Sequence, residues 1–406
     1  MLPSYSDYAS YWQHDKDIVF LNHGSFGSCP VPILDKQTAL RNQMESEPVR
    51  FVIDEFEPLY EENKIALAEF VKCNPNDLVF VRNATMGVNT ILHSLKFNEG
   101  DEILIHNHGY GACLNAVHYY AELQHCKVIT AEIPFPIENE DQVVEAFLKA
   151  LTPRTKFALV DHITSATGLV FPIEKITKEL ESRGIEVLID GAHAPGMVDL
   201  NIDALGASYY TGNCHKWLCT PKGAALLHVR KDKQAKIIPL QISHFNDLYT
   251  GTEKHWSAQF MWPGTEDFTA YFCVKDSIHF MGNLMGSWEK LRNRNREICL
   301  NARKHIAEKT GTALPAPDTM ISHLANILVD NQAILPEKFF NMTPPLKKIL
   351  MEEYKIEVPV FLFNKSQPRF WVRIAVEAYN SIEQYEYLGN CLEEILKGNA
   401  SGKKRN

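Results

Sequence analysis

Short apolar runs alternate with amphipathic stretches through the first two thirds of this 406-residue chain, and this alternation constrains the fold most. The apolar runs predict strands at Leu78–Val81, Glu102–His106, Lys127–Thr130, Phe157–Val160, Glu186–Asp190, Tyr209–Thr211 and Ala224–Val229. The stretches between them have helical spacing and predict helices at Thr85–Ser94, Cys113–Leu123, Asp141–Leu151 and Ile173–Ser182. Such alternation predicts an α/β domain whose mostly parallel sheet, of about seven strands, is covered on both faces.

The pattern changes after residue 265, where strands and long helices no longer alternate regularly. The predicted elements are a helix at Trp288–Lys309, strands at Asn326–Val329, Val358–Phe363 and Arg369–Ala375, and a closing helix at Ile382–Leu396. We therefore expect a large domain over 20–265 and a smaller α+β domain over 266–406, to which an N-terminal arm, 1–19, is added.

Composition limits the kinds of partner. The formal charge of −9 argues against a nucleic-acid surface, because phosphate binding needs a basic face. No apolar run is long enough to span a bilayer, and residues 1–7 lack the regions of a secretion signal. The nine cysteines are an odd number without a CxxC pair, which favours a reduced, cytoplasmic protein over a disulfide scaffold.

Polar residues follow several of the predicted strands directly. Asn83, Tyr110, Ser165, Asp190 and Lys216 each come after a different apolar run. Ligands of open parallel sheets bind outside the carboxyl ends of the strands. Because these separate loops converge on one edge of the sheet, we expect the functional site there.

The strongest chemical signal is an acid and a lysine on neighbouring loops. A buried strand ends in Asp190, and Lys216 follows in the polar, Gly-flanked loop 212–221. A lysine can form a Schiff base with the aldehyde of pyridoxal phosphate (PLP), while an acid pairs with its pyridinium nitrogen. Lys216 must be neutral for this reaction, so burial and nearby positive charge are expected to lower its pKa. The spacing therefore predicts a PLP site.

The same residues resemble a known family. Asp190–Gly196 and Tyr210–Trp217 look like the motifs of class V aminotransferase-fold PLP enzymes, which have fold type I. The resemblance is strongest to the isopenicillin N epimerase-like subgroup, through Leu21–Ser25, Trp262–Asp267, Val372–Ile374 and Tyr379-Asn380. It runs from about residue 15 to residue 396 and is more specific for fold and cofactor than for the reaction.

The resemblance implies roles around the cofactor ring. Tyr110 matches, by its offset from Asp101, the residue that stacks on the pyridine face. His193 matches the position beside the ring and its phenolic oxygen, which Ser165 or Thr164 can also reach. Lys216, Asp190 and Tyr110 are therefore the expected catalytic residues.

The phosphate is expected where the first strand passes into a helix. Backbone N–H groups at a helix N-terminus bind anions, which points to Ala84, Thr85 and Met86. Asn213 and His215 lie on the lysine loop and are expected to add donors.

The resemblance further implies that Gly264 and Thr265 reach the phosphate from a neighbouring subunit, so that the protein is a homodimer.

The substrate is expected to be a small molecule, an amino acid whose side chain the sequence does not identify. Arg373 is the predicted partner of its carboxylate, because a guanidinium binds a carboxylate through two hydrogen bonds. Asn22, His23 and Arg50 are expected to line the entrance. His106 and His108 suggest a metal pair, but no third ligand accompanies them, so no metal is expected.

Two reactions at Cα remain open, and both begin with an external aldimine and loss of the Cα proton to give a quinonoid. The resemblance favours an epimerase, which needs a second acid or base. The alternative is β-elimination by a C–S lyase, similar to cysteine desulfhydrases or hercynylcysteine sulfoxide lyases. An aminotransferase and a non-catalytic PLP-fold binding module are less favoured. A persulfide-forming desulfurase is disfavoured, since no cysteine lies between Cys299 and Cys391.

Overall fold

The computed structural model describes residues 2–329, 345–363 and 369–400. Its largest element is a seven-stranded sheet of order β2-β8-β7-β6-β5-β3-β4. The strands are β2 (Leu78–Val81), β3 (Glu102–His106), β4 (Lys127–Ala131), β5 (Thr155–Asp161), β6 (Glu186–Asp190), β7 (Tyr209–Asn213) and β8 (Ala225–Val229). Every pairing is parallel except those of β8, which runs antiparallel to β2 and β7. The predicted mostly parallel sheet is confirmed, with strand ends within two residues of those expected.

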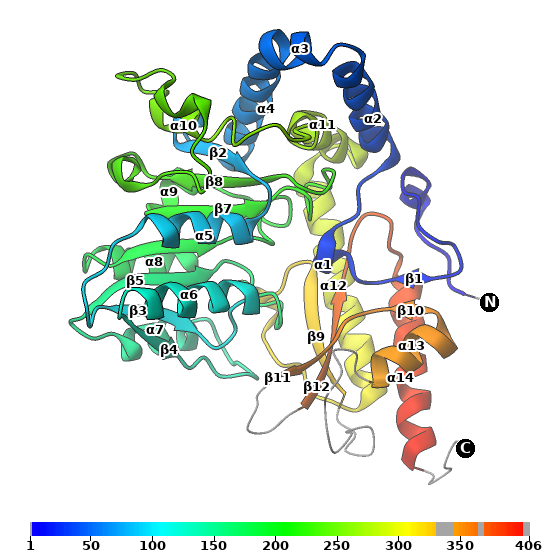
Figure 1. The fold of residues 1–406 in the computed structure, drawn as a ribbon. Coiled ribbons are helices and arrows are strands. Elements are labelled where there is room, and N and C mark those ends of the chain that lie inside the picture. The colour runs from blue at the N-terminus through cyan, green and yellow to red at the C-terminus, as the bar shows by residue number, and fades with distance from the viewer. Residues whose placement is uncertain (1, 330–344, 364–368, 401–406) are drawn as a thin grey trace.

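Helices cover both faces of this sheet (Figure 1). The helices α5 (Ala84–Ser94) and α6 (Gly111–Leu123) lie on one face, and α7 (Asp141–Ala150) and α8 (Ile173–Glu181) lie on the other. The strands bury alternate residues on each side. In β6, for example, Leu188 joins the core under α5 and α6, and Ile189 joins the core under α7 and α8. Burial on both faces explains why the strands are continuous apolar runs in the sequence.

The second body of the structure is a three-stranded antiparallel sheet of order β11-β12-β9, next to two long helices. Its elements are β9 (Leu324–Val329), β11 (Val360–Phe363), β12 (Arg369–Ala375), α12 (Trp288–Thr310) and α14 (Ile382–Ala400). These agree with the predicted α+β elements, although the strand predicted at Val358–Phe363 begins only at Val360. Before it, a short β10 (Ile356–Glu357) pairs with β1 (Val19–Phe20), and Pro359, which lacks an N–H, lies between β10 and β11.

Two N-terminal helices form an arch at the top of Figure 1. The helix α2 (Val31–Ser46) is joined to α4 (Phe56–Val71) by α3 (Pro48–Arg50) and a π-helical turn, η2 (Phe51–Glu55), and α4 packs against α11 (Val274–Leu284). The remaining short helices are α1 (His23–Phe26), α9 (Ile202–Leu205), α10 (His255–Gln259) and α13 (Pro345–Tyr354). The division of the chain at residue 265 stays a prediction.

None of the helices in the described ranges combines the length and the apolar character that a membrane span needs.

Candidate active site

A cavity of about 380 Å³ lies at the carboxyl edge of the large sheet. It is lined by Ser25, Phe26, Asn83, Ala84, Thr85, Tyr110, Asp161, Ile163, Ser165, Asp190, Ala192, His193, Asn213, His215 and Lys216. Segments far apart in the sequence therefore meet at the edge where the sequence placed the functional site. Lys216 and Asp190, the pair on which the predicted chemistry depends, share this one cavity.

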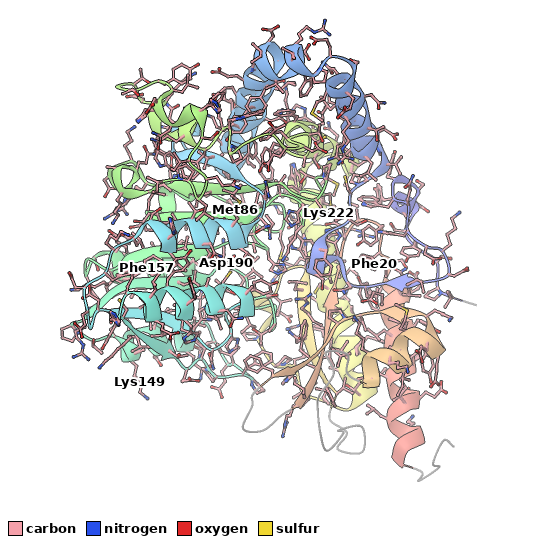
Figure 2. The ribbon with its side chains drawn as sticks, in the orientation of Figure 1. Phe20, Met86, Lys149, Phe157, Asp190 and Lys222 are labelled. Atoms are coloured by element: carbon pink, nitrogen blue, oxygen red, sulfur yellow. The ribbon has the colours of Figure 1, made fainter. Side chains whose placement is uncertain are left out.

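Asp190 ends β6 of the seven-stranded sheet (Figure 2). It is 3% exposed. Its Oδ2 accepts a hydrogen bond from the Cys113 thiol (3.2 Å), and its Oδ1 accepts one from the Ala192 N–H (3.0 Å). Burial, helped by the neighbouring Asp161, raises the pKa of Asp190 to about 6. The carboxylate is thus mostly ionised at neutral pH and suits a cationic ring nitrogen, whose charge lowers that pKa further.

Lys216 lies on the loop after β7, with its Nζ 3.2 Å from Nε2 of His193. Burial, reinforced by the positive charge of Arg373, lowers the pKa of Lys216 to about 8, as the sequence analysis expected. The Trp217 indole N–H donates to Nδ1 of His193 (3.3 Å). The neutral His193 ring therefore carries its proton on Nε2, facing the neutral form of the lysine amine.

The N-terminus of α5 forms the wall expected to hold the phosphate. Asn83 caps this helix by accepting from the Met86 N–H (2.8 Å), and Asn213 Oδ1 accepts from the Ala84 N–H (2.9 Å). Two of the three predicted backbone donors are thus engaged, and Met86 does not line the cavity. Thr85 does line it, and the Asn213 amide keeps its NH₂ group as a donor.

The sequence predicted His215 as a hydrogen-bond donor to the phosphate, but its ring N–H is already used elsewhere. Its Nδ1–H donates to the Ala224 carbonyl (3.0 Å), and burial lowers its pKa to about 4. The neutral ring therefore presents an acceptor, not a donor, at Nε2. A dianionic phosphate nearby would raise the pKa of His215 and favour the donating, protonated form.

Of two further predicted residues, Tyr110 lines the cavity, whereas Arg373 is not among the lining residues. Tyr110 stands at the N-terminal end of α6 and is 46% exposed, which leaves its ring able to stack on a bound ring. Arg373, on β12, is buried directly behind the cavity wall. Its guanidinium donates to the Ser165 carbonyl and to Ser25 Oγ (3.2 Å), and lies 5.1 Å from the centre of the Phe361 ring.

Five further predicted residues do not line the cavity of this chain. His23 is buried beneath the lysine loop, and Asn22 is buried and donates to Glu357 (3.1 Å). Arg50 is an exposed residue paired with Glu47 and Glu55. Gly264 and Thr265 belong to a partly exposed segment outside this cavity.

Sequence reasoning missed Asp161, which ends β5 directly beside Asp190 in the sheet register. It is 2% exposed, and its Oδ1 lies 3.2 Å from Nε2 of His106. Burial raises the pKa of Asp161 well above its usual range. The signal was present in the sequence, because Asp161 follows an apolar run just as Asp190 does. Ser25, Phe26 and Ile163 were also missed.

His106 and His108, the pair considered as metal ligands, each contact other protein groups. His106 contacts Asp161, while His108 accepts at Nδ1 from the Thr167 hydroxyl (2.7 Å) and donates at Nε2 to the Ile133 carbonyl (3.2 Å).

The residues present fit PLP as a cofactor. The cavity offers a carboxylate for a ring nitrogen, a lysine amine with a lowered pKa for an aldehyde, and a helix N-terminus for a phosphate. On an α/β sheet of this topology, these features define a PLP-dependent enzyme of fold type I. The class V aminotransferase family matches residues 30–335, and the chain belongs to this family.

Individual relatives differ in their reactions. The chain is 27% identical to a probable chloroplastic L-cysteine desulfhydrase of Arabidopsis thaliana, over 95% of this chain and 84% of that protein. It is 29% identical to an isopenicillin N epimerase of Amycolatopsis lactamdurans, over 94% and 96%. A solved complex of a cystine C-S lyase with its product, cysteine persulfide, shares the fold, with a TM-score of 0.77, 19% identity and coverage of 93% and 98%. The predicted family, fold class and cofactor are confirmed.

Proposed function

We propose that this enzyme cleaves the Cβ–S bond of a small amino acid by PLP-dependent β-elimination. One observation carries the proposal: a single amine base, Lys216, with a pKa of about 8, enters the cavity beside a neutral histidine. Elimination needs one base at Cα, whereas epimerisation needs two. PLP, when bound, supplies the electron sink that stabilises negative charge at Cα.

The residues of this chain then have separate tasks. Lys216 removes the Cα proton, and the His193 Nε2–H orients its amine. Arg373 lies where it can bind the substrate carboxylate after exchanging its contacts with Ser25 and Ser165. Asp190 would hold positive charge on the ring nitrogen of bound PLP. The Cα–H and Cβ–S bonds break as a double bond forms between Cα and Cβ, and the thiolate leaves and takes up a proton. The resulting 2-aminoacrylate tautomerises to an imine, which water hydrolyses to ammonia and a 2-oxo acid.

The relatives support this reading, because a cysteine desulfhydrase aligns over nearly the whole chain. Epimerisation is the second candidate. Tyr110 favours it, since its exposed ring lines the cavity and offers a second acid group. The 29% identity to an isopenicillin N epimerase points the same way.

The two reactions are separated by their products. The holoenzyme is incubated in D₂O with L-cysteine and with S-alkyl-L-cysteines, and thiol, 2-oxo acid and ammonia are measured beside optical rotation. Release of all three products in equal amounts supports elimination. Loss of optical rotation with deuterium at Cα and no release identifies an epimerase instead. Neither change with any substrate favours a binding module. Lys175→Met, which alters an exposed lysine paired with Glu140 and Asp141 outside this cavity, serves as the control.

We further propose that the enzyme is a homodimer. Phe26 lines the cavity yet is 75% exposed, and Val49 and Ile53 on the arch are exposed apolar residues. Gly264 and Thr265 are then expected to complete the phosphate site of the second subunit. Sedimentation equilibrium tests this, and a monomer at micromolar concentration contradicts it.

We also propose a cytoplasmic location. The support is that all nine cysteines are free, seven of them buried. Cell fractionation of a tagged chain is the corresponding test.

A further inference from the structure

His23 is fully buried under the lysine loop and bridges two distant parts of the chain. One ring nitrogen, Nε2, lies 2.9 Å from the Lys216 carbonyl, and the other, Nδ1, lies 2.9 Å from the Tyr379 hydroxyl. A carbonyl can only accept, so Nε2 carries the proton and donates it. Nδ1 then has a lone pair and accepts from Tyr379. Both contacts thus require the same neutral tautomer.

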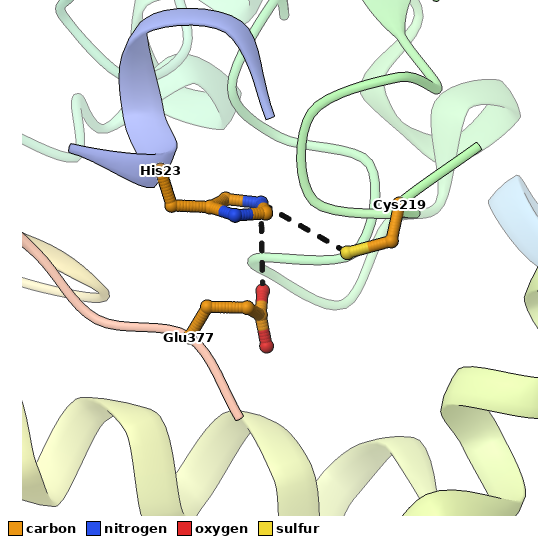
Figure 3. A group of neighbouring side chains, drawn as sticks. All are labelled: His23, Cys219 and Glu377. Atoms are coloured by element: carbon orange, nitrogen blue, oxygen red, sulfur yellow. Dashed lines mark hydrogen bonds and ion pairs between the residues drawn. The ribbon is translucent and has the colours of Figure 1, made fainter. Parts of the chain in front are cut away.

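Cys219 and Glu377 surround the same ring and, with it, resemble a metal centre (Figure 3). The Cys219 Sγ lies 3.9 Å and a Glu377 carboxylate oxygen 3.8 Å from Nε2 of His23. A metal ion needs the lone pair of that nitrogen, but the hydrogen bond to Lys216 places a proton there. Glu377 also has other partners, because its Oε1 accepts from the Asn295 amide (3.0 Å) and the Ala378 N–H (2.7 Å). The hydrogen-bonded description explains the cluster without a metal.

The carbonyl that His23 holds belongs to a tight turn. The Lys216 oxygen also accepts from the Cys219 N–H (3.1 Å), and Cys219 has the left-handed φ of +58°. The N-terminal segment packs closely against this turn, since a Cβ added at Gly27 would lie 1.9 Å from the His215 carbonyl oxygen. The main chain of Lys216 is therefore fixed by the segment that contains His23.

The same segment reaches the predicted substrate residue. Ser25, two residues after His23, accepts from Arg373 through its Oγ (3.2 Å). Tyr379, which donates to His23, follows the strand β12 that contains Arg373. A continuous set of contacts thus joins Arg373 to Lys216 by way of residues 23–25.

We propose that His23 is a positioning residue for the cofactor lysine: the hydrogen-bonded chain Tyr379–His23–Lys216 fixes the main chain from which Nζ enters the cavity and ties it to the strand of Arg373. The inference rests on the proposal that Lys216 carries PLP. It adds a role for a residue that does not line the cavity.

The test compares His23→Leu with His23→Gln in the holoenzyme. Leucine cannot donate to the Lys216 carbonyl, whereas the glutamine amide reaches about as far as Nε2 and can. We expect His23→Leu to weaken PLP binding about tenfold, the effect of one lost buried hydrogen bond. The pH midpoint of the bound cofactor's absorbance should move as well, and His23→Gln should recover most of both. His228→Leu, which removes another buried histidine from β8 outside the cavity, should leave both readouts unchanged.

Tyr379→Phe provides a second measurement that does not alter the ring of His23. It removes the hydroxyl that fixes the tautomer, so both readouts should shift in the same direction as in His23→Leu, by less. The inference is overturned if His23→Leu, or Tyr379→Phe where the leucine variant does not fold, keeps the wild-type affinity and midpoint. Zinc bound in equal amount to the wild-type protein and lost in His23→Leu would overturn it in favour of a metal site. Absence of any cofactor label on wild-type Lys216 would refute the proposed function itself, which keeps the two failures distinct.

Discussion

The clearest quantitative prediction concerns the protonation of Lys216. Only the neutral amine attacks the PLP aldehyde, so the rate of Schiff-base formation in the apoenzyme follows the neutral fraction. The pKa of Lys216 is lowered from 10.5 to about 8. At pH 7 this gives roughly 300-fold more neutral amine than an ordinary lysine would have. The rate should rise with pH and level off above a midpoint near 8.

Arg373→Met tests the cause of this shift. Methionine keeps much of the side-chain length but removes the positive charge that helps to lower the pKa of Lys216. The midpoint should move to higher pH, and the rate at pH 7 should fall, while burial still keeps the pKa below 10.5. Stopped-flow absorbance after mixing apoenzyme with PLP, from about pH 6 to pH 10, measures both. Lys175→Met, which removes the charge of an exposed lysine outside the cavity, is the matched control and should behave as the wild type.

A wild-type midpoint close to that of a free lysine would refute this reasoning, since the amine would then be neither buried nor near Arg373. A midpoint unaffected by Arg373→Met would show that the charge of Arg373 does not lower the pKa of Lys216 and that burial alone does.

Three further predictions concern residues of the same cavity. Lys216→Ala should lower turnover by at least roughly 10³-fold, because it removes the covalent link and the base together, and a loss below tenfold in steady-state assays would show that another group is the base. Asp161→Asn should lower the pKa of Asp190, because the charge of Asp161 raises that pKa. The Asp190 carboxylate then stays ionised to lower pH, so the holoenzyme should retain PLP during dialysis at a more acidic pH than the wild type does. If the variant lost PLP at the same pH as the wild type, this prediction would be wrong. Asn213→Ala should weaken PLP binding about tenfold in equilibrium titration, since Asn213 holds the Ala84 N–H at the α5 N-terminus, and an unchanged affinity would exclude that role.

Most elements of the seven-stranded sheet could be predicted because each strand is determined by a short stretch of neighbouring residues. A strand buried on both faces must be a short apolar run, and the residue at its carboxyl end must face the edge of the sheet. This reasoning placed Asp190 and Lys216 in one cavity. Asp161 also ends a buried strand, but Ser165, four residues later, was predicted as the site residue of this loop instead.

Other features depend on contacts that no local pattern reveals. His23 was expected at the entrance, but it is buried because it bonds to Lys216 and Tyr379, which lie 193 and 356 residues away. The helix α2 was not predicted, since only Ile33, Gln37 and Leu40 of its residues are buried, too few for a clear apolar stripe.

The central claim is the covalent link between PLP and Lys216. Borohydride reduction of the holoenzyme, followed by peptide mapping with mass spectrometry, tests it directly. One pyridoxyl group per chain is expected on Lys216 and none on Lys222, the other lysine of the same loop region. Label on any other lysine, or release of all the cofactor unreduced, would contradict it.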